Sequence, residues 1–332
     1  MIMQPAVIAL FLGSILSSSM VLYSAYFGVA ILRHWDLKSG SELQLGLERK
    51  TYLVATIMSY SFAFQLFSLF LFIFTADKLN SLFTGAMCAA GTLNVNHYGY
   101  PALILKVIGF ILGGTWLIMN YADNRAFDYP LIRRKYFFLA AIAPFLIAEA
   151  MVQAAYFLNL KPHVITSCCG SLFSAEGSSA SVVLAALPVG PAGITFYAAL
   201  GFTFVTGLFF LRKERTGYLF SASCAVTFVV SAVSLVSFIS PYFYELPTHR
   251  CPFCILQKEY HSVGYFLYVT LLSGVVCGTG IAALAGTRKI ESLQGTIPRL
   301  LKSLAVIAMV SYLLFAVVVT LKMVLTDFRL EW

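Results

Sequence analysis

Eight separate apolar segments, each long enough to cross a lipid bilayer, are the feature that most limits how this chain can fold. A helix needs roughly 20 residues to span the hydrocarbon core. Inside lipid, backbone polar groups must be satisfied within the segment itself, which favours helices for apolar runs of this length. We therefore predict an all-α, polytopic membrane helix bundle with about eight transmembrane helices. The expected spans are residues 6–32, 52–75, 102–121, 136–158, 192–211, 218–240, 263–286 and 303–325.

The composition excludes a soluble globular protein. Hydrophobic residues make up 60% of the chain and charged residues only 11%, whereas soluble domains carry about a quarter charged residues. The net charge of +8 does not indicate a nucleic-acid partner, because the cations lie in short loops between apolar spans. No Lys or Arg precedes Arg33, so we expect the first span to be retained and not cleaved as a secretory signal.

Charge in the loops predicts the orientation of the chain. Four alternate loops, residues 33–51, 122–135, 212–217 and 287–302, together hold 15 Lys and Arg residues. The positive-inside rule places these loops in the cytoplasm and both termini outside it. The opposite loops and outer helix ends then hold five of the seven cysteines, namely Cys88, Cys168, Cys169, Cys251 and Cys254. Disulfides persist in oxidising compartments, so we predict a bacterial inner-membrane protein with its cysteine loops on the periplasmic side.

The run Cys251-Pro252-Phe253-Cys254 lies immediately before the seventh predicted span. A thiolate is favoured at a helix start, where unpaired N–H groups and the helix dipole are positive. Lys258 follows Cys254 by four residues and would share its helical face. The pattern therefore predicts a redox-active dithiol. Zinc is the alternative, but a structural zinc site needs four ligands, and this pair has only His249 and His261 nearby.

The five outer cysteines cannot all pair with one another, so at least one is a thiol or an exchange partner. Cys168 and Cys169 are adjacent, and a disulfide between neighbours closes a strained ring. We expect one of the two to pair with Cys88 or to attack Cys251, since strained disulfides are the ones that exchange. The alternative is an inert staple between Cys88 and one member of the adjacent pair.

The region from about residue 136 to 325 resembles the vitamin K epoxide reductase family and, more loosely, the DsbB-type disulfide-generating quinone reductases. The resemblance lies in the order of parts: a span, an outer cysteine loop, two spans, then the Cys251–Cys254 motif before two final spans. The residues Cys254-Ile255-Leu256-Gln257-Lys258 are similar to a DsbB-type motif, in which the basic residue is usually arginine. Cys88 and the run at 96–103 are similar to a loop-to-helix entry of bacterial members. The adjacent shuttle cysteines and the three preceding spans depart from the family pattern. We accordingly divide the chain into an N-terminal three-helix region, 1–135, and a reductase-like bundle, 136–332.

This resemblance implies a membrane thiol:disulfide oxidoreductase that exchanges electrons between outward-facing cysteines and a membrane quinone, either ubiquinone or menaquinone. It implies that Cys254 faces the quinone and that Cys251 exchanges with a loop cysteine or with a periplasmic thioredoxin-like protein. Gln257, Lys258 and His261 are the expected contacts of the quinone oxygen, because charge that develops there needs stabilisation in a dry site.

Four further residues lie inside the predicted spans. Charged groups at such depth are expensive and usually mark function or pairing, so we expect Lys106 and Glu149 to form a pair, or Glu149 to carry protons to the quinone. Cys224 and Cys277 are expected to pack as small hydrophobic residues.

Two other functions fit the same pattern. His97, His163, His249 and His261 all lie in outward segments, so the chain could be a haem- or metal-binding module. It could also be a structural anchoring subunit of a larger membrane electron-transfer complex, with lipid and neighbouring subunits as its partners.

Overall fold

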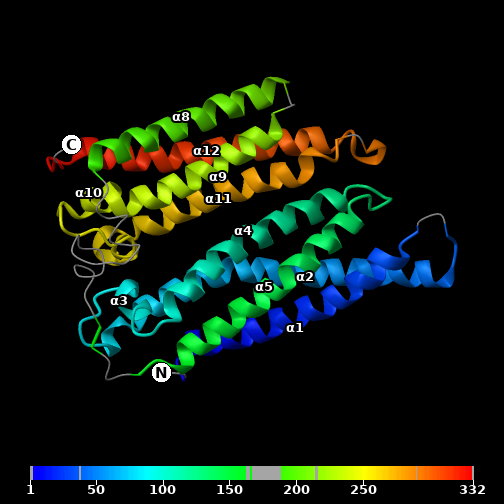
Figure 1. Cartoon of the computed structure of the whole chain (residues 1–332), viewed down its shortest axis with the longest axis horizontal. Helices are drawn as coiled ribbons and strands as arrows, with labels where there is room; N and C mark the ends of the chain where they lie inside the picture. Colours follow the sequence, from blue (N-terminus) through cyan, green and yellow to red (C-terminus); the bar gives the residue numbers. More distant parts are fainter. Residues whose placement is uncertain are drawn as a thin grey trace. The chain divides into compact units, whose positions relative to one another are not determined.

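The computed structural model describes residues 3–36, 39–161, 165–166, 188–213, 216–288 and 290–330. These residues form helices joined by turns, without any strand, and eight of the helices are long and apolar enough to cross a membrane. This confirms the all-α class and all eight predicted spans, as expected of a multi-pass membrane protein. The long helices are α1 (Pro5–His34), α2 (Glu42–Lys78), α4 (Gly99–Asp123), α5 (Ile132–Leu158), α8 (Val189–Lys213), α9 (Gly217–Ser234), α11 (Val263–Ala285) and α12 (Ile297–Leu325) (Figure 1).

Two spans differ from the simple helix that hydropathy predicts. Helix α2 has 37 residues, about 55 Å at 1.5 Å per residue, so its polar first turns extend beyond a hydrocarbon core of about 30 Å. The sixth span continues from α9 through a π-helical turn, Leu235–Ile239, into α10 (Ser240–Tyr244). Pro241 explains the turn, because proline lacks an N–H and its ring crowds the carbonyl four residues earlier.

The chain divides into two compact units. Unit 1 comprises Met1–Thr75, Asn96–Leu160 and Gly286–Leu300, and unit 2 comprises Ala76–Val95, Lys161–Ala285 and Leu301–Trp332. Helix α5 therefore groups with the first three long helices, although the sequence suggested a boundary at residue 135. The short helix α3 (Ala89–Leu93) and the Cys88 loop belong to unit 2. The functional division at residue 135 stays a prediction.

Close helix contacts within each unit depend on glycine. In unit 1, α5 packs against α1 and α4, and a Cβ at Gly113 would lie 2.9 Å from the Phe62 ring. In unit 2, α9 packs against α8 and α11, and a Cβ at Gly278 would lie 2.5 Å from Cys224. Small residues of this kind let membrane helices approach closely. Cys224 thus lies in a packed helix contact.

A buried polar network closes the α4–α5 hairpin of unit 1. Lys135 Nζ lies 2.7 Å from Asp123 Oδ2 and donates to Asn120 Oδ1 at 3.0 Å, while Asp123 Oδ1 accepts the Leu131 N–H.

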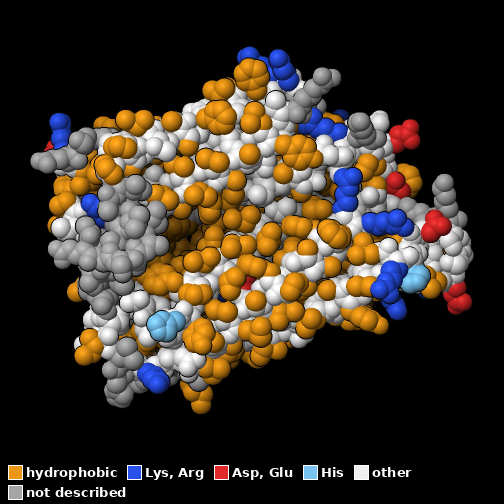
Figure 2. Space-filling view, in the orientation of Figure 1, with side chains coloured by type: hydrophobic (Ala, Val, Ile, Leu, Met, Phe, Trp, Pro, Cys, Tyr) orange, Lys and Arg blue, Asp and Glu red, His pale blue; other side chains and the backbone are white. Residues whose placement is uncertain are grey.

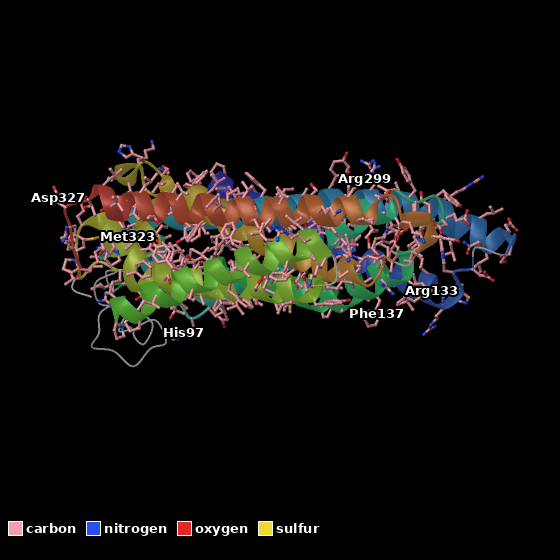
Figure 3. All side chains as sticks on the ribbon, turned by 90° about the horizontal axis from the view of Figure 1, so that it is seen from above. His97, Arg133, Phe137, Arg299, Met323 and Asp327 are labelled. Carbon is pink, nitrogen blue, oxygen red and sulfur yellow. The ribbon has the colours of Figure 1, made fainter. Side chains whose placement is uncertain are left out.

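Figure 2 shows that Lys and Arg side chains gather near one end of the helices within each unit. In unit 1, Arg133 lies at the opposite end from His97 (Figure 3). The assignment of the basic end to the cytoplasm stays a prediction.

Candidate functional site

Three cysteine sulfurs meet inside unit 2. The Sγ atoms of Cys88, Cys251 and Cys254 all lie within 4.8 Å of one another, and Cys88 Sγ is 3.5 Å from Cys251 Sγ. All three residues are buried. A separation of 3.5 Å is a non-bonded contact, because a disulfide bond measures about 2.05 Å. A short movement would therefore bring two of these sulfurs to bonding distance.

Cys88 is held by a tight loop that follows α2. Cys88 precedes α3 with an extended backbone, and the N–H of Ala89 donates to Asp77 Oδ1 at 3.2 Å. Gly85 has a φ of +88°, and a Cβ there would lie 2.3 Å from the carbonyl oxygen of Thr166, so this position requires glycine. Thr166 in turn donates its hydroxyl to the carbonyl of Gly91. The loop is thus fastened on both sides of Cys88.

Two tyrosines shape the segment that carries the other two sulfurs. The hydroxyl of Tyr244 donates to the carbonyl of Cys251 and accepts the N–H of Ile255 at 2.9 Å. The hydroxyl of Tyr268 donates to the carbonyl of Pro252. These two hydroxyls therefore fix the main chain within the motif and just after it.

Gln257 joins the two cysteine-bearing segments. Its side-chain amide donates to Asp77 Oδ1 at 3.2 Å and to the carbonyl of Met87 at 2.9 Å. Asn80 donates to the same carbonyl at 3.0 Å. Sequence reasoning gave Gln257 the role of a quinone contact, whereas its side chain here connects the turn after Cys254 to the residue before Cys88.

Replacing Gln257 by alanine is expected to slow formation of a Cys88–Cys251 disulfide up to about thirtyfold under a mild oxidant. Two hydrogen bonds would be lost, and each is worth about 1 kcal/mol net. The measurement is the yield of the cross-linked peptide pair against time. Lys258→Ala is the control, since Lys258 is exposed on the adjacent position. Equal rates in the two variants would show that the Gln257 amide does not position the sulfurs.

The prediction that the motif opens a continuous helix is wrong. Short 3-10 turns cover Cys254–Leu256 and Lys258–Tyr260, and the intervening residue Gln257 is extended. His261 is left-handed, and α11 begins only at Val263. The chain folds back here because Ile255 packs on Gly264, where a Cβ would meet Ile255 atoms at 2.8 Å.

The turns also correct the expected position of two basic residues on one helical face with Cys254. Lys258 and His261 do not share a helical face with Cys254, and both are exposed. The start of α11 lies nine residues beyond Cys254, so this cysteine is not part of that helix. Contact of the two basic side chains with a quinone oxygen stays a prediction.

Lys106 and Glu149 form the predicted ion pair within unit 1. Lys106 Nζ is 3.0 Å from Glu149 Oε1 and donates to Ser68 Oγ at 3.2 Å, while Gln65 donates to Glu149 Oε2. Both charged residues are buried. They belong to unit 1, whereas the three cysteines belong to unit 2.

The remaining candidates are distributed as follows. Cys168, Cys169 and His163 lie outside the described residues. Cys277, like Cys224, is buried within a long helix of unit 2. His97 is exposed in a turn of unit 1.

Sequence reasoning missed the contact between Cys88 and Cys251 and the roles of Asp77 and Tyr244. The signal for the first was the small-residue run Ala89-Ala90-Gly91 after Cys88, which permits close burial of that loop. No local pattern marks Tyr244, because its hydrogen-bond partners lie beyond the end of its own helix.

His249 lies beside this site. Its Nε2 atom is buried without a hydrogen-bond partner, and its ring meets the Tyr244 ring edge to face at 4.4 Å. Burial lowers the pKa of His249, and the nearby Cys88 thiolate opposes this with a smaller effect. The neutral imidazole is therefore the main form near pH 7.

Comparisons with protein-family models, curated proteins and solved structures gave no match for this chain.

Proposed function

We propose that this chain is a membrane thiol:disulfide oxidoreductase in which Cys88, Cys251 and Cys254 pass a disulfide among themselves. The observation that carries the proposal is the burial of three sulfurs within 4.8 Å of one another. Thiol–disulfide exchange requires attack of a thiolate on a disulfide sulfur through a mixed disulfide. The Cys251 sulfur takes part in both proposed disulfides, because it belongs to the motif and also contacts Cys88.

The exchange step conserves electrons. The Cys88 thiolate attacks Cys251 Sγ of a Cys251–Cys254 disulfide, the bond between these two sulfurs breaks, and Cys254 leaves as a thiolate. The new bond joins Cys88 to Cys251. Holding the reactants in contact makes this step effectively unimolecular, which can greatly raise its rate.

A membrane quinone is the proposed acceptor for the reduced pair. Oxidation of the Cys251 and Cys254 thiols to a disulfide releases two electrons and two protons, and these convert one quinone to its quinol. The resemblance to quinone-linked reductases supports this part of the proposal. The reverse direction, in which a quinol reduces the disulfide, uses the same atoms.

The cysteine end is proposed to face the periplasm of a bacterial inner membrane. The support is the gathering of Lys and Arg in the loops at the other end of the spans. A thioredoxin-like protein on that side would exchange with the cluster, and Cys168 or Cys169 would serve as the shuttle. The lipid bilayer surrounds the apolar helices.

The haem alternative gains no support from the described histidines of the outward segments. A haem held in a bundle needs histidines on facing helices. His97 and His261 lie in exposed turns, and His249 lies between helices. A purely structural subunit would leave the three thiols without chemistry, and the following experiment distinguishes that case.

The test maps disulfides by mass spectrometry in reduced, purified protein before and after a ubiquinone analogue is added. We expect a quinone-dependent Cys251–Cys254 disulfide in the wild type and a Cys88–Cys251 disulfide in the Cys254→Ala variant. Cys277→Ala is the control and should behave as the wild type. If quinone fails but a small disulfide oxidant gives the same pairs, exchange stands without the quinone. If Cys251 joins no disulfide in folded protein under either oxidant, the function is wrong.

A further inference from the structure

The same three sulfurs form a ligand set that the sequence did not reveal. The motif alone offers two thiolates, and the contact with Cys88 adds a third from 163 residues away. In a tetrahedral site with zinc–sulfur bonds of about 2.3 Å, the sulfurs are about 3.8 Å apart. The Cys88–Cys251 separation of 3.5 Å is close to that value, and no pair of the three sulfurs is more than 4.8 Å apart.

We propose that the reduced Cys88, Cys251 and Cys254 bind one divalent soft metal ion of the zinc class, with His249 as the fourth ligand. Binding replaces three thiol protons with one metal ion, and no electron moves. Thiolates select soft ions such as zinc and monovalent copper. Burying net charge is costly. Three thiolates carry one net negative charge with a divalent ion but two with monovalent copper, so the buried site favours the divalent ion.

His249 completes a Cys₃His set, which is a known structural zinc combination. Its Nε2 is buried without a partner, and its ring packs on Tyr244, whose hydroxyl bonds to the Cys251 carbonyl. The imidazole is outside the group of atoms that lie within 4.8 Å, so the ring turns toward the sulfurs when the ion enters. Buried polar atoms normally have a partner, and the metal supplies one here.

Hydrogen bonds that hold the ligand-bearing segments in place are already formed. Asp77 accepts the N–H of Ala89 next to Cys88 and the amide of Gln257 three residues after Cys254. Such outer contacts orient metal ligands, and their loss typically lowers metal affinity 10- to 100-fold.

Metal binding and disulfide exchange exclude each other at this site. A disulfide between any two of the three cysteines removes two ligands, so only the fully reduced chain binds the ion. The metal proposal needs the reduced thiols alone and does not rest on the proposed exchange activity. A chain that binds metal but never exchanges disulfides would retain this inference and refute the proposed function.

The experiment titrates reduced, full-length protein in detergent with Cd²⁺, whose thiolate charge-transfer absorption reports the number of bound sulfurs, and then displaces it with Zn²⁺. Cys168→Ser/Cys169→Ser serves as the background, so that these two thiols do not contribute. We expect one ion per chain and a band that falls by about one third in Cys88→Ser. In the same variant, Kd should rise at least about 100-fold, because loss of a group that only hydrogen-bonds to a ligand already costs 10- to 100-fold. Cys277→Ala is the matched control and should bind as the background does.

His249→Ala separates the fourth ligand from the sulfurs. We expect the full charge-transfer band with an affinity about tenfold lower, and an unchanged affinity would remove His249 from the site. A band of equal intensity in Cys88→Ser and the background would overturn the three-sulfur site, as would the absence of any band when thiol titration counts all three cysteines as reduced. Melting of the metal-free variants checks that each is folded.

Discussion

Replacing Cys251 by alanine is expected to lower the rate of thiol-dependent quinone reduction at least about 100-fold. Cys251 is the sulfur in contact with Cys88 and is also one half of the motif, so its loss removes both the motif disulfide and the Cys88–Cys251 contact. The reacting sulfurs would no longer be held together, and holding reactants in place raises the reaction rate by several orders of magnitude in well-oriented systems. The measurement is quinol formation with a reduced dithiol as electron donor.

Cys224→Ala is the matched control for Cys251→Ala. Both cysteines are fully buried in unit 2, and each change leaves a similar small void. Both variants should therefore lose a similar, small amount of stability, while only Cys251→Ala loses activity. Full activity in Cys251→Ala would contradict the proposed role of the Cys251 sulfur, and equal loss in both variants would indicate a packing effect instead.

Replacing Lys106 by methionine is expected to destabilise unit 1 by about 3–5 kcal/mol, the usual cost of leaving one buried charge of a pair without its partner. Glu149 would then keep only the Gln65 amide as a hydrogen-bond donor among its described side-chain partners. The double variant Lys106→Met/Glu149→Gln should recover most of that loss, because no charge remains buried. The measurement is the free energy of unfolding in mixed micelles.

An exposed ion pair in the same chain supplies the comparison. Lys322 lies 2.8 Å from Glu245, with side chains 31% and 54% exposed, so Lys322→Met should destabilise the protein far less than Lys106→Met. If Lys106→Met proved as mild as Lys322→Met, the Lys106–Glu149 pair would not be held in a dry interior. A double variant no more stable than Lys106→Met would point to lost packing instead of an uncompensated charge.

The spans and the buried ion pair could be predicted because their causes are local. Hydrophobic length alone defines a span, since lipid forces each segment to satisfy its own backbone. Lys106 and Glu149 were recognisable because each charge is costly inside an apolar segment, and a partner of opposite sign was available at similar depth.

The site around Cys251 was not predictable in the same way. Its third sulfur comes from a loop 163 residues earlier, and no periodicity in the sequence encodes such a contact. The expected helix after Cys254 does not form, because tertiary contacts override local preference. The Tyr244 hydroxyl accepts the N–H of Ile255, and the Gln257 amide donates to the Cys88 loop. Sequence spacing therefore misplaced Lys258.

The two short turns between Cys254 and α11 have a mechanical consequence. Forming a bond from a 3.5 Å contact requires the sulfurs to approach by about 1.5 Å, given a disulfide length of about 2.05 Å. Had the whole motif been part of α11, moving Cys251 toward Cys88 would have required α11, which packs against α9, to move as well. Because both motif cysteines precede α11, the Cys251 sulfur can approach either Cys88 or Cys254 while α11 stays in place.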